Sequence, residues 1–133
     1  PVIASNYTGR FSYLGQPKPW KHEIILQLVA EPKGESANRS HVDITPEHGI
    51  DDAVSRIEAL GGRVKKSPSI YPRPGSFDRP PVIDWAVMQD PFGNEFCLVH
   101  ELTAEQSDAV LAAAAENPDQ DDHAWRVAAG QTA

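Results

Sequence analysis

Residues 40 to 101 carry an ordered series of secondary-structure signals that restricts the fold more than any other feature of the chain. Ser40 to Thr45 alternates polar and apolar residues, as a half-buried strand does. The next apolar residues follow helical spacing and are Ile50, Val54, Ile57 and Leu60. Gly61 and Gly62 then predict the end of that helix, because glycine tolerates the left-handed conformation beyond a helix C-terminus. Three more strands are predicted at 63–67, 82–89 and 95–99. The order strand, helix, strand, strand, strand predicts an α+β unit.

Two connections in this unit are predicted from turn chemistry. The segment 68–81 contains five prolines in fourteen residues and is predicted to be a loop. The segment 90–94, Asp-Pro-Phe-Gly-Asn, has the composition of a tight turn between the last two strands.

The first 32 residues are predicted to form three extended pieces, at 1–5, 10–15 and 22–30, and a polar loop runs to residue 39. The last of these pieces contains 26–31, which can be laid on 96–101 at the end of the second unit. This match suggests an internal duplication. The first copy of the repeat would then begin with what corresponds to its second strand, and its opening strand and helix would be missing.

The chain after residue 101 has a different character. Thr103 is a suitable N-cap for a helix that runs to Ala115, and Asn117-Pro118 would end it. The remaining residues are mostly polar or small, so we expect them to be loosely ordered unless Trp125 docks. In that case Trp125 would cover the gap left by the missing helix of the first copy.

Charge and cysteine content narrow the classes of partner. The 133 residues fit one domain and carry a net charge of −7, which disfavours nucleic acid and anionic membrane surfaces as partners. Cys97 is the only cysteine, so an intrachain disulfide is excluded. Because we find neither a secretory signal nor an apolar run of membrane-spanning length, we expect a cytoplasmic protein.

Several motifs of the second unit occur together in one known group of proteins. They are His41-Val42-Asp43-Ile44, the helix ending Ala59-Leu60-Gly61-Gly62, Trp85, and the run from Asp90 to Val99. In this order the motifs resemble the second module of the vicinal oxygen chelate superfamily, and most of all its glyoxalase-like domain branch. The resemblance covers roughly residues 10 to 101. It implies paired βαβββ modules whose curled, mixed β-sheets form a cup around a small molecule.

This resemblance implies one domain in three parts. Residues 1–32 would be a partial first module that lacks its opening strand and helix, 40–101 the second module, and 102–133 a C-terminal helix and tail.

Metal-using members of the superfamily take four ligands from the first and last strands of the two modules. Carried over by position, His41 matches the ligand that begins the second module, and Gln27 falls at the last strand of the first. Cys97 stands where the family usually has glutamate, and the fourth position would lie on the missing strand. We therefore expect no cofactor as the first interpretation. A divalent zinc, iron, manganese or nickel ion held by His41 is the alternative.

The residues expected to line the ligand pocket are Gln27, His41, Asp43, Trp85 and Cys97. Asp43 shares a strand face with His41 and could orient its imidazole or touch the ligand, although a surface or helix-capping role is an equal alternative. Glu95 lies on the strand face of Cys97 and could replace the missing carboxylate, although an exposed role beside the turn is the simpler interpretation. Cys97 is expected to behave as a small buried hydrophobic residue rather than a nucleophile. The loop 68–81 would form part of the rim.

Three functions remain open from the sequence. The first is a metal-free domain that binds a small molecule, as the drug-binding, bleomycin-resistance type of the superfamily does. The second is a metal-dependent lyase or isomerase, or an extradiol-type dioxygenase, that uses His41. The third is a non-catalytic interaction module, in which a homodimer completes the cup by exchanging strands.

Overall fold

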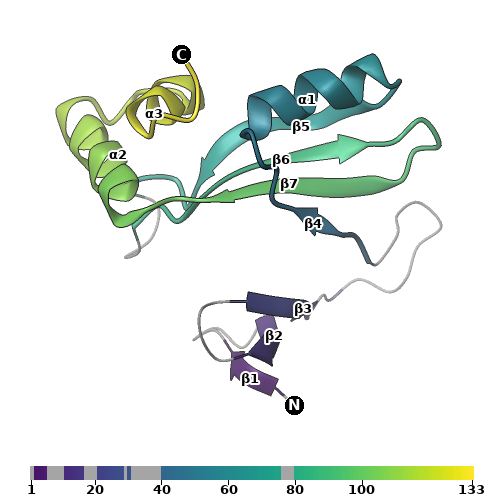
Figure 1. The fold of residues 1–133 in the computed structure, drawn as a ribbon. Helices are drawn as coiled ribbons and strands as arrows, with labels where there is room; N and C mark the ends of the chain where they lie inside the picture. The colour runs from purple at the N-terminus through teal and green to yellow at the C-terminus, as the bar shows by residue number, and fades with distance from the viewer. Residues whose placement is uncertain (1, 6–10, 17–20, 29, 31–39, 76–79) are drawn as a thin grey trace. The chain divides into compact units, whose positions relative to one another are not determined.

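The computed structural model describes residues 2–5, 11–16, 21–28, 30, 40–75 and 80–133, which form two compact units (Figure 1). The first unit is Pro1–Arg39 and the second is Ser40–Ala133.

The described part of the first unit is a three-stranded antiparallel sheet in the order β1-β2-β3. Its strands are β1 (Val2–Ser5), β2 (Phe11–Gln16) and β3 (Lys21–Gln27). This confirms the three extended pieces predicted at the start of the chain. Gln27 ends β3 opposite Phe11. The structure describes the backbone of Gln27 but not its side chain.

The second unit contains a four-stranded mixed sheet in the order β4-β7-β6-β5. Its strands are β4 (Asp43–Ile44), β5 (Arg63–Tyr71), β6 (Ile83–Gln89) and β7 (Glu95–Glu101). The strand β4 runs parallel to β7, and the other neighbours are antiparallel. With the helix α1 (Ile50–Ala59) between β4 and β5, the predicted order of elements from 40 to 101 is confirmed. The unit is therefore α+β, while the pairing of two modules around a cup stays a prediction.

The helices of the second unit leave one face of its sheet without a helix (Figure 1). Ile50 of α1 packs in a buried cluster with Ala86, Met88 and Leu98, which places α1 on the face that these strand residues share. Alternation along β6 then turns Trp85 and Val87 to the opposite face. We call this second surface the helix-free face. The strand register adds Asp43, Lys66, Ser69, Cys97 and Val99 to it.

The segment 68–81 departs from the predicted loop. Its first four residues continue β5, which therefore runs through Pro68 to Tyr71. Proline is tolerated there because β5 is an edge strand and its register shifts twice, between Val64 and Lys66 and between Lys66 and Ser69. Residues 76–79 of the predicted loop lie outside the described part.

The strand predicted at 40–45 is shorter in the structure. Only Asp43 and Ile44 are paired as strand, with Cys97 and Leu98 of β7. The backbone carbonyl of Val42 still accepts a 2.9 Å hydrogen bond from the N–H of Cys97. His41 therefore lies just before the strand rather than inside it.

The C-terminal segment is more ordered than its composition suggested. The predicted helix is α2 (Ala104–Glu116), and Thr103 and Gln106 form a capping box at its start. A further helix, α3 (Asp122–Ala128), was not predicted. Trp125 on α3 is 1% exposed and packs with Ile70, Val110 and Ala129. Trp125 thus docks onto β5 and α2 of its own unit, which is the condition under which the tail was expected to be ordered.

Candidate functional site

Three of the predicted site residues converge on the helix-free face. Asp43 and Cys97 are direct neighbours in the parallel register of β4 and β7. His41 precedes Asp43 by two residues, and its Nε2 lies 3.3 Å from Asp43 Oδ1. One ligand atom from each of His41, Asp43 and Cys97 lies within 4.8 Å of the others. In this geometry the Asp43 carboxylate lies close enough to hydrogen-bond the His41 imidazole.

The thiol of Cys97 is held in its neutral form. Burial is the main cause that raises its pKa to about 11, and the charge of Asp43 and a hydrogen bond with Asp43 add to the rise. The thiolate is the reactive form of cysteine, and very little thiolate is present at neutral pH when the pKa is this high. Without a bound metal ion, Cys97 is therefore a poor nucleophile, and His41, Asp43 and Cys97 do not make a cysteine-type catalytic triad.

Trp85 lies on the same face, one strand further from β4. Trp85 is half-buried, and the residue opposite it on β7 is Val99. The ammonium of Lys66 lies 4.2 Å from the centroid of the Trp85 ring. Tyr71 meets the same ring edge to face, with centroids 6.5 Å apart and planes at 75°. Trp85 therefore forms the centre of an aromatic and cationic group that is distinct from the His41 cluster.

Glu95, the alternative carboxylate, is engaged elsewhere. It forms an ion pair with the ammonium of Lys65 on β5. The described group of converging metal-ligand side chains contains Asp43 and not Glu95. The carboxylate beside Cys97 and His41 therefore comes from β4.

Sequence reasoning did not identify Lys66 as a site residue. Strict alternation along β5 does not predict its position, because the strand is bulged between Val64 and Lys66. The pair Lys65-Lys66 was the one available signal, since adjacent lysines in a strand often mark an irregular edge.

The donors of the His41 cluster fit a divalent ion such as zinc. An imidazole, a carboxylate and a thiolate are all common zinc ligands, with bonds of about 2.0 to 2.3 Å that place tetrahedral ligand atoms roughly 3.5 Å apart. The 3.3 Å between His41 and Asp43 matches that spacing. Both of these side chains are about half exposed, so rotation about their side-chain bonds could close the remaining distance to Cys97.

Comparison with known proteins identifies one matching family. The family model for the glyoxalase-like domain matches residues 6–99, well over half of the chain. No curated protein and no solved structure matches the chain significantly. The described residues contain no helix that is both long and apolar enough to cross a bilayer. The matched segment includes the predicted site residues Gln27, His41, Asp43, Trp85 and Cys97. The chain therefore belongs to the glyoxalase-like domain family of the vicinal oxygen chelate superfamily.

Proposed function

We propose that this protein binds a small organic molecule on the helix-free face of its second unit, with Trp85 as the central contact. The observation that carries the proposal is the placement of the four described site residues. His41, Asp43 and Cys97 lie together at the β4 side of this face, and Trp85 lies toward β5. Membership in the glyoxalase-like family supports the same class of function.

The face has the composition that small-molecule sites share. Its centre is apolar, because Val87 and Val99 lie between the two polar groups. Such sites combine apolar and aromatic surface with a few polar groups that orient the ligand. In the metal-free form, the His41 imidazole, held by Asp43, would supply one orienting hydrogen bond.

A direct test uses saturation-transfer NMR with a panel of small aromatic compounds, comparing wild type with two aromatic variants. Trp85→Leu should abolish the transfer from compounds that bind wild type. Phe92→Leu is the matched control, because Phe92 lies in the turn after β6 and is 91% exposed. It should keep every signal. Equal binding by W85L and wild type would move the ligand away from this face.

The convergence of His41, Asp43 and Cys97 favours a second candidate function, a metal-dependent lyase or isomerase. These three residues would hold the ion, and remaining coordination positions would be open to substrate oxygens. When bound, the ion would act as a Lewis acid on those oxygens. Many iron-dependent oxygenases hold their metal with two histidines and one carboxylate. The cluster here has one histidine, one carboxylate and one cysteine, so it does not match that site. The lyase or isomerase is therefore the better metal-dependent alternative.

Elemental analysis of protein purified without chelator or histidine tag tests this second candidate. Stoichiometric zinc, iron, manganese or nickel that is lost in His41→Ala would support it. His48→Ala is the control. The His48 side chain is 67% exposed, and the ion-pair partner described for it is Glu47, which is not part of the His41 cluster. Metal-free protein that takes up none of these ions on incubation would refute the metal mechanism and leave the first proposal standing.

A further inference from the structure

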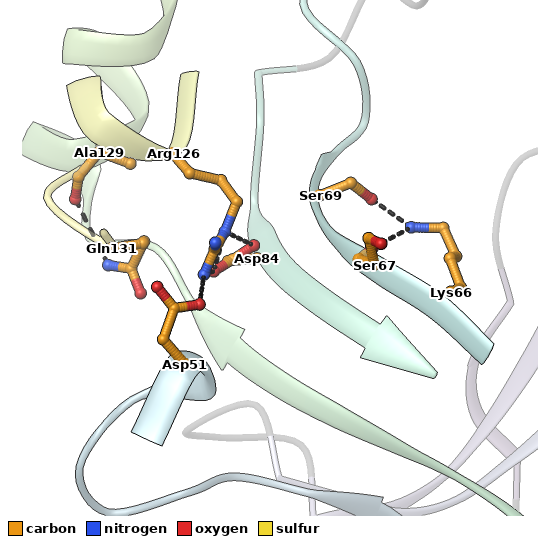
Figure 2. A network of polar contacts seen from close by, with 8 residues as sticks. All are labelled: Asp51, Lys66, Ser67, Ser69, Asp84, Arg126, Ala129 and Gln131. Atoms are coloured by element: carbon orange, nitrogen blue, oxygen red, sulfur yellow. Dashed lines mark hydrogen bonds and ion pairs between the residues drawn. The ribbon is translucent and has the colours of Figure 1, made fainter. Parts of the chain in front are cut away.

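Lys66 lies on the helix-free face and has no carboxylate ion-pair partner among the described residues. Its ammonium donates to Ser69 Oγ and, at 3.4 Å, to the carbonyl of Ser67 (Figure 2). Within the described part of the chain Lys66 forms no ion pair, whereas the adjacent Lys65 pairs with Glu95. Of these two neighbouring lysines, Lys65 is paired with a carboxylate, whereas the ammonium of Lys66 lies against the ring of Trp85.

This charge is also partly removed from water. Lys66 is half-buried, and burial is the main cause that lowers the pKa of its ammonium, while the negative charges of Asp122 and Asp84 oppose this shift. A desolvated cation gains more from an added counter-ion than an exposed one does. The site therefore favours an anionic partner even though the whole chain carries a net charge of −7.

Ser69 adds a second donor beside the ammonium. Its hydroxyl oxygen accepts from Lys66, so its own hydrogen remains available to donate, and no described residue accepts it. The two donors, one of them charged, suit the two oxygens of a carboxylate. Ser69 lies directly opposite Trp85 in the register of β5 and β6, so both donors flank the indole.

The surface next to Trp85 suits a flat ring. Lys66 and Tyr71 both approach the indole from β5. On the other side of Trp85, its strand partner on β7 is Val99, and Val87 follows two residues along β6 on the same face. These short apolar side chains would lie under a planar ligand, and the indole would form a wall beside it. Adjacent strands are about 4.8 Å apart, so a ring over β6 and β7 would lie within reach of Lys66 on β5.

We propose that Lys66 and Ser69 recognise the carboxylate of a small planar aromatic acid, whose ring lies over Val87 and Val99 beside Trp85. This inference rests on the proposed small-molecule function and names the chemical class of its ligand. Lys66 sets the preference for an acid over a neutral compound of the same shape.

Isothermal titration calorimetry of the full chain tests this with three pairs of compounds: benzoate and benzamide, cinnamate and cinnamamide, and 2-naphthoate and 2-naphthamide. Each pair has nearly one shape and differs in charge. Wild type should bind at least one acid about tenfold or more tightly than its amide, as expected for a charge-assisted hydrogen bond. Inorganic phosphate, which carries charge without a ring, should not compete at equal concentration.

The variants assign that preference to one side chain. Lys66→Met should reduce the affinity for the acid about tenfold and leave the amide unchanged, and Lys66→Arg should restore the preference. Lys65→Met is the matched control, because it removes the same charge one residue away and should change neither affinity by more than about twofold. Circular dichroism of each variant verifies that it is folded.

The possible outcomes distinguish a failure of the role of Lys66 from a failure of the proposed small-molecule binding. Equal affinity for an acid and its amide, or an equal loss in K65M and K66M, would refute the role of Lys66 and leave a neutral ligand on the same face. Competition by inorganic phosphate would refute recognition of the ring. Absence of binding by every compound, acid and amide alike, would overturn the ligand class and count against the proposed function itself.

Discussion

Arg126 and Asp84 form a buried ion pair in which the Nε of Arg126 lies 2.9 Å from both carboxylate oxygens of Asp84 (Figure 2). Asp84 is fully buried and the Arg126 side chain is 7% exposed. The Nη2 of Arg126 also donates to Asp51 at 2.7 Å. One guanidinium thus joins α3, β6 and the first turn of α1 on the helix-covered face of the sheet.

Replacing Arg126 with methionine should lower the free energy of unfolding by about 3 to 5 kcal/mol, because Asp84 would stay buried without its counter-ion. Urea denaturation followed by circular dichroism measures this loss. Arg56→Met is the matched control, since Arg56 is 74% exposed and its 3.8 Å pair with Asp52 should contribute less than about 1 kcal/mol. Equal losses in the two variants would contradict a structural role for the buried pair.

The stability deficit of R126M should depend on pH in a defined direction. Burial raises the pKa of Asp84, and the hydrogen bonds from Arg126 oppose this rise. Without Arg126, native Asp84 would therefore bind a proton more readily than the unfolded chain does. The difference in unfolding free energy between wild type and R126M should shrink as the pH is lowered from neutral into the acid range. A difference that grows over this range would show that Asp84 is not the unpaired charge.

The thiol of Cys97 should react slowly with iodoacetamide at neutral pH, and the rate should rise steeply toward pH 11. The reason is the raised pKa of about 11, for which burial is the first cause and the charge of Asp43 the second. Mass spectrometry gives an unambiguous rate because the chain has one cysteine. Asp43→Asn should speed the reaction at a given pH, whereas Asp52→Asn should not. A rate equal to that of a free cysteine in wild type would mean that the thiol is neither buried nor close to Asp43.

Deleting residues 117–133 should lower the melting temperature, because it removes Trp125 and Ala129 from their cluster with Ile70 and Val110. The point variant Trp125→Ala isolates the packing contribution and should cost about 3 to 5 kcal/mol. Differential scanning calorimetry checks both. Val127→Ala lies on the same helix at a position that is 44% exposed and should change little. An unchanged melting curve for the deletion would mean that α3 contributes nothing to the fold.

The capping box of α2 should contribute about 1 kcal/mol to stability. Thr103 Oγ1 accepts a 3.2 Å hydrogen bond from the N–H of Gln106, and Gln106 Oε1 accepts one of 2.9 Å from the N–H of Thr103. Thr103→Ala removes the first of these, and Thr103→Ser should retain it. Urea denaturation of the two variants compares them, and equal stabilities would contradict the cap.

Local patterns predicted most elements of this fold. The apolar stripe of α1, its ending at Gly61-Gly62 and the turn that begins at Asp90 all depend on neighbours in sequence. In the structure, the carboxylate of Asp90 accepts hydrogen bonds of 2.9 Å from the backbone N–H groups of Phe92 and Asn94. Gly61 has a φ of 93°, the left-handed value expected after the helix. Such features can be predicted because their interactions span only a few residues.

Long-range contacts decided the features that were not predicted. A short polar helix such as α3 carries too weak a pattern to be recognised, and docking of Trp125 and the Arg126 pair orders it. The extension of β5 through Pro68 depends on bulges and on an edge position. Lys66 became a candidate site residue for the same reason, since its position beside Trp85 follows from a register shift.

The sequence alone determined which chemical groups this protein could use: one cysteine, a histidine two residues before an aspartate, and a tryptophan in a predicted strand. It also determined the family, through the order and spacing of its motifs. Tertiary structure decided which of these groups meet. Asp43 rather than Glu95 joins Cys97, because strand pairing brings residues 54 positions apart into register and Lys65 engages Glu95. Pairing across a sheet depends on the partner strand, which local sequence does not encode.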